Sequence, residues 1–261
     1  MSQILTILRH TLRDGLRSRV VYGLGAFFAL AGWMMLRLGG DGGKALLSLL
    51  SLSLALVPLV SLTYGASHLY QARRFIGLML AQPVPRHTVF LGLYAGLSLP
   101  LALAWAVGVA LPLLATGAVQ DPQALLLLLT AGVSLALIFS AIAFWVSMAV
   151  ENRLKGLGLA IGSWLALAIG WDGMVLMLSY QLADYPLEGP VLALCLANPI
   201  DLARILVLLR FDLGAMMGYT GAVFRLFFQG NLGIALAGLA LLLWVALPLG
   251  MAWRAFSRKD F

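Results

Sequence analysis

Six stretches of the chain are long and apolar enough to cross a lipid bilayer as helices. The hydrocarbon core of a bilayer, about 30 Å thick, needs about 20 apolar residues in helical conformation, and a helix satisfies its own backbone polar groups there. Hydrophobic residues make up 62% of the sequence and charged residues 10%, whereas soluble domains are about 25% charged. The sequence therefore predicts an all-α integral membrane protein. The six expected spans are residues 20–36, 45–67, 89–115, 124–150, 157–180 and 232–253.

The first 19 residues have the pattern of an amphipathic helix that lies in the membrane surface. At 100° per residue, apolar side chains fall on one side of this helix and basic side chains on the other. Such a helix buries its apolar side among lipid headgroups and holds its cations against an anionic leaflet. We therefore expect an interfacial helix over residues 1–19. Its apolar side holds Ile4, Leu5, Leu8, Leu12 and Leu16, and its basic side holds Arg9, Arg13 and Arg17.

The basic residues predict the orientation of the spans. Most of the 17 Lys and Arg residues precede span one, separate spans two and three or four and five, or follow span six. Cytoplasmic segments carry this excess, so we expect both termini in the cytoplasm. Clusters at span edges indicate membrane topology rather than nucleic-acid binding. The prediction is one transmembrane domain, 1–261, with spans one to five in 20–180, an outer segment in 181–231, span six in 232–253 and a cytoplasmic tail in 254–261.

The stretch 68–88 is the most polar break between two spans and carries arginines but no acid. Its middle can form a short helix with one apolar side, and Pro83 and Pro85 stop that helix because proline lacks a backbone donor. A short basic helix at this place either lies on lipid or docks into another protein. The residues expected to contact a partner are Gln71, Arg73, Arg74, Phe75 and Leu78.

The segment between spans five and six is too apolar to be a free loop. Its pattern predicts two short helices, re-entrant or acting as a gate, which are separated by a break at Asn198. Asn198 suits the N-cap of the second helix and Pro199 its first turn. Asp201 and Arg204 are spaced for an i,i+3 ion pair. We expect this segment to form an outer gate or to contact a periplasmic partner.

Few side chains in the spans carry chemistry. Asp172 is the one acid inside a predicted span, which makes it a functional candidate, and a structural role near the end of the span is the alternative. Cys195 stands alone in an apolar run and is expected to be buried and inert. Methionines bind copper(I) but more often fill gaps between helices. The weak metal candidates are Met174, Met177, Met216 and Met217.

No catalytic constellation, metal-ligand spacing or phosphate-binding loop occurs in the sequence. Gly156 and Gly158 follow no strand and are read as helix-packing residues rather than as a nucleotide fingerprint. The chain is therefore not expected to be an enzyme or to bind a cofactor itself. If the protein uses ATP, another chain binds it.

Six spans, a basic helix after the second span and an outer helical segment before the sixth resemble the ABC-2 type permease family. The motif carrying the resemblance is residues 77–86, GLMLAQPVPR, followed by residues 89–92, VFLG. The resemblance implies that the loop after span two is a coupling helix that docks into an ATPase subunit. It further implies a homodimer with two ATPase copies, which bind ATP and Mg²⁺, and a location in the bacterial inner (cytoplasmic) membrane.

A narrower resemblance is to the branch of that family that supports maturation of the copper site of nitrous oxide reductase. It rests on the start of the chain through DGLRSR, on Trp171-Asp172, and on the outer segments 198–204 and 217–224. This branch implies a periplasmic copper-handling partner and makes copper a possible cargo. The sequence departs from the family in lacking acids before Gly77 and in carrying Leu93 and Tyr94 where a lysine is usual. A charge-swapped docking surface is one explanation.

Two other functions remain open from the sequence. The chain is also compatible with an ABC-2 exporter of lipid, peptide or drug. A membrane anchor that transports nothing and assembles with a larger complex is the alternative from a different class.

Overall fold

The computed structural model describes residues 11–39, 41–81, 84–117, 121–181, 193–208 and 231–259. Every regular element in these ranges is a helix, and six helices are long and apolar enough to span a membrane. The predicted all-α fold with six spans is therefore confirmed. The elements are α2 (Arg19–Gly39), α3 (Gly42–Leu80), α4 (Arg86–Ala115), α5 (Pro122–Ala149), α6 (Arg153–Leu165), η1 (Ala166–Gly170), α7 (Trp171–Gln181), α9 (Pro199–Leu208) and α11 (Asn231–Arg258).

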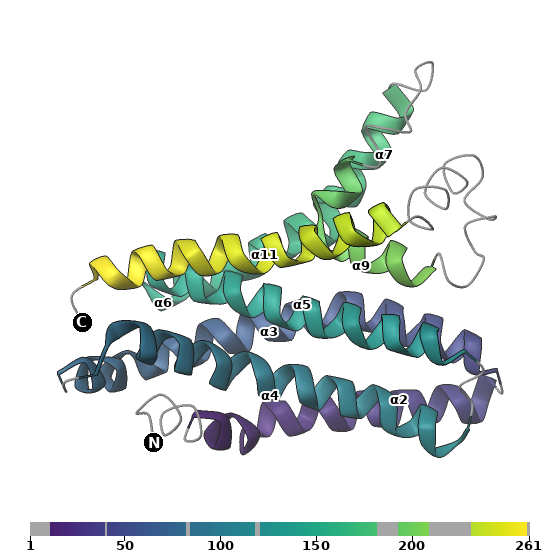
Figure 1. The fold of residues 1–261 in the computed structure, drawn as a ribbon, viewed down its shortest axis with the longest axis horizontal. Helices are drawn as coiled ribbons and strands as arrows, with labels where there is room; N and C mark the ends of the chain where they lie inside the picture. The colour runs from purple at the N-terminus through teal and green to yellow at the C-terminus, as the bar shows by residue number, and fades with distance from the viewer. Residues whose placement is uncertain are drawn as a thin grey trace.

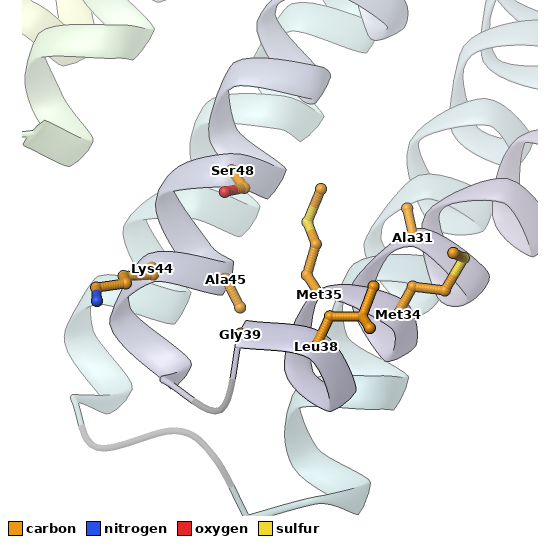
Figure 2. A pocket seen from close by; sticks show the side chains of 8 residues that line it. All are labelled: Ala31, Met34, Met35, Leu38, Gly39, Lys44, Ala45 and Ser48. Atoms are coloured by element: carbon orange, nitrogen blue, oxygen red, sulfur yellow. The ribbon is translucent and has the colours of Figure 1, made fainter.

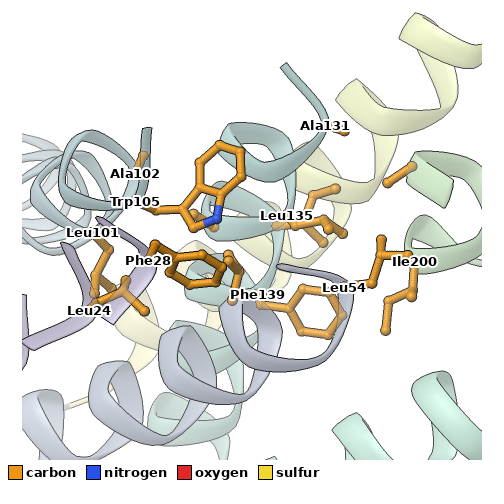
Figure 3. Packing of buried hydrophobic residues seen from close by; sticks show 14 of the residues in the cluster. Leu24, Phe28, Leu54, Leu101, Ala102, Trp105, Ala131, Leu135, Phe139 and Ile200 are labelled. Atoms are coloured by element: carbon orange, nitrogen blue, oxygen red, sulfur yellow. The ribbon is translucent and has the colours of Figure 1, made fainter. Parts of the chain in front are cut away.

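Helix α5 lies in the middle of the bundle. It packs against α3, α4, α9 and α11 (Figure 1), and it carries no charged side chain. Trp105 of α4 is fully buried and donates its Nε1–H to Ser53 Oγ of α3 at 3.0 Å. Its ring also meets Phe28 of α2 edge to face, with 6.2 Å between the ring centroids. Figure 3 shows these aromatic rings and Phe139 of α5 packed among leucines, so one core joins four spans.

Helices α2 and α4 approach through small residues. A Cβ at Gly108 would lie 2.5 Å from the Gly25 carbonyl oxygen, and a Cβ at Gly25 would lie 3.0 Å from the Ala104 carbonyl oxygen. In a membrane, where lipid is as apolar as leucine, close backbone packing of this kind is a main source of helix association. These glycines therefore fix α2 against α4.

Short polar side chains begin three of the helices. Asp41 caps α3 by accepting from the Gly43 amide at 2.9 Å, and Asp121 caps α5 in the same way from Gln123 at 2.9 Å. Asn152 caps α6 through the amides of Leu154 and Lys155. Each cap satisfies amides that have no partner inside the helix.

The prediction of a separate short helix after span two is wrong. Helix α3 is continuous over 39 residues, from Gly42 to Leu80, so the basic stretch is its last part. The residues after Ser67 are mostly good helix formers, and Pro58 does not end the helix. The helix ends before Pro83, as the sequence predicts.

Span five also differs from the single helix expected over 157–180. It consists of α6, the π-helical turn η1 and α7, and α7 leaves the bundle at an angle to α6 (Figure 1). A π-turn inserted in an α-helix commonly marks a functional position. The break falls directly before Trp171 and Asp172.

The interfacial helix expected over residues 1–19 lies partly outside the described residues. Residues 11–16 are helical. Thr11 Oγ1 donates to the Gly92 carbonyl at 3.0 Å, and a Cβ at Gly15 would overlap the Gly96 carbonyl and Pro100 of α4. This part of the segment packs on protein, and its placement along the lipid surface stays a prediction.

Candidate functional site

Helix α3 is too long to lie wholly inside a membrane. At 1.5 Å per residue its 39 residues extend over about 58 Å, nearly twice the thickness of the hydrocarbon core. Charged side chains are costly in the hydrocarbon core, so the last turns, which carry Arg73 and Arg74, extend beyond it at the end of the bundle where Arg86 donates to the carbonyls of Ser257 and Lys259. We call this the basic end of the bundle.

Four of the five predicted partner-contacting residues share one exposed stripe on this projecting part of α3. Gln71, Arg74, Phe75 and Leu78 are spaced i, i+3, i+4 and i+7, the period of one helix face, and all are exposed. Phe75 is 54% exposed and Leu78 70% exposed. These residues lie on the part of α3 that extends beyond the hydrocarbon core. A cation beside two exposed apolar side chains is there the composition of a protein-docking surface. We call it the α3 stripe.

Arg73 lies on the other side of the helix and has partners within the chain. Its Nη2 donates to the carbonyls of Ser147 at 2.7 Å and Val150 at 2.8 Å, and its Nη1 donates to the carbonyl of Glu151 at 2.7 Å. Its guanidinium also stacks over Tyr70, 4.4 Å from the ring centroid. Arg73 thus satisfies carbonyls that the end of α5 leaves without helical partners, and it does not extend the α3 stripe.

Tyr70 completes this contact between α3 and the α5–α6 junction. Its hydroxyl donates to the Val150 carbonyl at 2.9 Å. A Cβ at Gly156 would overlap that hydroxyl, so the first turns of α6 approach α3 only because residue 156 is glycine. Arg73, Tyr70 and Gly156 together form what we call the α3–α5 clamp.

Basic residues close other helix ends in the same way. Arg86 Nη1 donates to the carbonyls of Ser257 at 2.9 Å and Lys259 at 3.2 Å, after the last turn of α11. Lys259 Nζ donates to the Met148 carbonyl at 3.3 Å. Cations at helix C-termini interact favourably with the helix dipole, so part of the basic excess at this end serves the fold itself.

At the opposite end of the bundle, Asn198 caps α9 as expected. Its Oδ1 accepts from the Ile200 amide at 3.0 Å, and α9 begins at Pro199. Its Nδ2 donates to the Leu167 carbonyl of η1 at 2.8 Å and to Asp201 Oδ2 at 3.1 Å. A second contact joins the same elements, since Trp171 Nε1 donates to the Leu194 carbonyl at 3.2 Å. The break in span five and the start of α9 are therefore bonded to each other.

Arg204 brings together two acids that the sequence singles out separately. Its Nη1 lies 3.2 Å from Asp201 Oδ1, the predicted i,i+3 pair, and 3.3 Å from Asp172 Oδ2 of α7. Burial, and next the charge of Asp172, raise the pKa of Asp201 to about 6. Asn198, Asp172, Asp201 and Arg204 thus form one polar cluster, which we call the α7–α9 cluster.

Among the sulfur-containing residues singled out by the sequence, Cys195 lies near the α7–α9 cluster. Met174 and Met177 are exposed on α7, and Met216 and Met217 lie outside the described residues. Cys195 is buried, and burial, followed by the charge of Asp201, raises the pKa of its thiol to about 11. The described ranges contain no group of three His, Cys, Asp or Glu side chains positioned to hold a metal ion.

A pocket of about 500 Å³ opens between the end of α2 and the start of α3. Figure 2 shows Met35 pointing into the space between the two helices and the Lys44 amine pointing away from it. The rest of the lining is apolar apart from Ser48. The pocket therefore offers no set of hard or soft ligands around one point.

Several functional contacts were not foreseen from the sequence. Tyr70 and the Leu167 carbonyl have no sequence signal of their own, since their partners lie 80 and 31 residues away. The inward position of Arg73, by contrast, does have a signal in the sequence. Arg73 stands four residues after buried Leu69 and three before buried Ile76, which places it on their face of a continuous helix.

Replacing Arg73 tests the clamp. We expect Arg73→Ala to lower the free energy of unfolding by about 1–3 kcal/mol, because it leaves partly buried carbonyls without a charged donor. Arg74→Ala is the matched control, with an expected effect within about 0.5 kcal/mol because that side chain is exposed. Thermal unfolding of both purified variants in mild detergent measures the difference. Equal midpoints for the two variants would contradict the clamp.

The chain is similar to known proteins along its whole length. The family described as ABC-2 family transporter protein matches residues 55–261. The probable ABC transporter permease protein NosY of Stutzerimonas stutzeri is 29% identical over 279 residues, and its counterpart of the same name in Pseudomonas aeruginosa is 30% identical over 280 residues. Each alignment covers 99% of both chains. With its six spans, the chain belongs to the ABC-2 family and is a multi-pass permease subunit of an ABC transporter.

Proposed function

We propose that this permease supports maturation of the copper site of nitrous oxide reductase, together with two copies of an ATPase chain and a periplasmic copper-handling protein. The observation that carries the proposal is the similarity to two NosY permeases over 99% of the chain. The resemblance at Trp171-Asp172 and over residues 198–204 supports it, because Asp172, Asn198, Asp201 and Arg204 form the α7–α9 cluster. ATP and Mg²⁺ belong to the ATPase in this proposal.

Copper analysis of the reductase tests this function. In cells that lack this chain, we expect nitrous oxide reductase to be made and exported but to contain little copper, and a plasmid copy of the chain should restore the metal. Asp172→Asn should leave membrane insertion intact and reduce copper loading. Normal copper content without the chain would contradict the maturation role and favour an exporter of another cargo.

The ATPase docks, in this proposal, on the α3 stripe. Phe75 and Leu78 are apolar and exposed on a part of α3 that projects from the membrane, and Arg74 beside them offers a cation to an acidic partner surface. Arg73, by contrast, acts as a positioning residue, since it binds α3 to the end of α5. The basic end, with both termini, is the cytoplasmic side.

Variants of the α3 stripe test the docking. We expect Phe75→Ala with Leu78→Ala to weaken ATPase binding about tenfold or more, since truncating interface anchors commonly costs over 1 kcal/mol each. Arg74→Glu should weaken it through charge reversal. The control is Leu38→Ala, 84% exposed at the end of α2.

Co-purification of the ATPase with the tagged chain from mild detergent, followed by mass spectrometry, is the measurement. ATPase recovery equal to that of the control would exclude the stripe as the docking surface. Recovery of a different membrane complex, with no ATPase for the unmodified chain, would favour the anchor function instead.

A second copy of the chain covers span five in this proposal. No residue in the apolar window of that span is buried within one chain. Gly158 and Gly162 on α6 are both exposed, and a Cβ at either would meet nothing within 4 Å. Two glycines four residues apart on an open face let helices of two chains approach closely.

Bulky side chains at these glycines test the homodimer. We expect Gly158→Leu with Gly162→Leu to convert the dimer to monomer, because the added side chains keep the two backbones apart. Gly23→Leu on α2 is the control, since its Cβ position is open as well. The mass of the detergent-solubilised chain, measured by light scattering, gives the oligomeric state. An unchanged dimer would place the contact on another face.

A further inference from the structure

The α7–α9 cluster has two carboxylates around one guanidinium. Arg204 Nη1 lies within 3.3 Å of an oxygen of both Asp172 and Asp201. Asp201 is only 6% exposed, and its Oδ1 accepts no hydrogen bond despite its nearness to Arg204. Asn198 donates to the other oxygen of Asp201. One buried carboxylate oxygen is therefore left without a hydrogen bond, beside a second acid.

No other described group supplies the missing positive charge. Helix α9 packs against α3, α5 and α11. Helix α5 carries no charged side chain, the arginines of α11 lie at its far end, and Lys44 at the start of α3 is not among the charges that act on Asp201. Among the described residues, the remaining ionisable neighbour is the Cys195 thiol, which is neutral at ordinary pH. Within the described part of the chain, an ionised Asp201 therefore places a second negative charge beside one guanidinium at a largely buried site, which is unfavourable.

We propose that Asp201 binds a proton in the folded chain, and that this proton holds α9 against the break in span five. The bound species is a proton rather than a metal cation, because the Arg204 guanidinium already lies between the two acids. A protonated Asp201 becomes a donor, and two carboxyl groups that share a site commonly retain one proton. Water reaches the cluster beside Asp172 and Arg204, whose side chains are 39% and 35% exposed, and the proton of Asp201 exchanges with this water.

The electrostatics of Asp201 give the direction of the effect. Burial, then the charge of Asp172, raise its pKa to about 6, and hydrogen bonding to Asp172 acts in the same sense, while Arg204 and Asn198 oppose them. An acid whose pKa is raised by folding binds its proton more tightly in the folded state. The contribution of such an acid to the free energy of unfolding is therefore greatest at low pH, and it is lost as the pH rises through the pKa of the acid in the folded state.

The residues that hold the proton also hold α9 to span five. Asn198 donates both to Asp201 and to the Leu167 carbonyl of η1, and Arg204 reaches from α9 to Asp172 on α7. When Asp201 loses its proton, repulsion between the two acids acts across this contact. The contact between α9 and α7 is thus tight below about pH 6 and weaker above it.

Infrared titration of the full chain in lipid nanodiscs tests proton binding. The band of a protonated carboxyl, present in the unmodified chain and absent from Asp201→Asn, should titrate with a midpoint near 6. Asp172→Asn should lower that midpoint by about one unit or more, because it removes the neighbouring negative charge. Asp41→Asn is the control, since asparagine also caps helices well, and it should change nothing. A midpoint close to 4, the ordinary value for aspartate, would overturn the proposal.

Hydrogen–deuterium exchange tests the contact between α9 and span five. The exchange rate of the α9 amides is measured in the unmodified chain and in Asp201→Asn at each pH. The ratio of the two rates, unmodified chain to variant, should rise from about pH 5 to about pH 8. Equal exchange in the two proteins at every pH would overturn the mechanical part of the proposal. Neither measurement needs the ATPase or the reductase, so these outcomes are independent of the proposed function.

Discussion

Backbone hydrogen bonding at the ends of helices is the constraint on which this structure depends. Inside a bilayer a helix satisfies its own amides and carbonyls, but the last turn leaves carbonyls without partners. Here Arg73 closes the end of α5 and Arg86 the end of α11. Asn198 does the same for a carbonyl exposed by the π-turn of span five. Arg73 and Asn198, two of the functional candidates in the sequence, therefore serve the backbone.

This constraint separates two adjacent arginines by role. Successive residues on a helix point about 100° apart, so Arg73 turns toward the α5 carbonyls while Arg74 stays exposed beside Phe75 and Leu78. The α3 stripe thus carries one cation rather than two. The stripe is therefore less basic than the sequence suggests, since the Arg73 guanidinium binds carbonyl oxygens of the same chain.

The sequence predicts what depends on local pattern. The spans follow from apolar length, the pair Asp201–Arg204 from its i,i+3 spacing, and the start of α9 from Asn198 and Pro199. It does not predict the link from Arg204 to Asp172, because 32 residues separate them. The continuous α3 could be predicted only in part. If the helix is assumed to continue past Ser67, the apolar positions Leu69 and Ile76 indicate which face of its last turns is buried.

Span five is held by different partners on the two sides of its π-turn. Helix α6 packs against α3 and α5, and Gly156 lets it approach Tyr70 in the α3–α5 clamp. Beyond the turn, the polar contacts of Trp171 and Asp172 go to the segment around α9. Tyr70 and Gly156 place the last part of α3 in contact with α6, whereas Arg204 joins α7 to α9. A π-turn accommodates a change of helix direction more readily than regular α-helix does, so η1 is where these two sets of restraints meet.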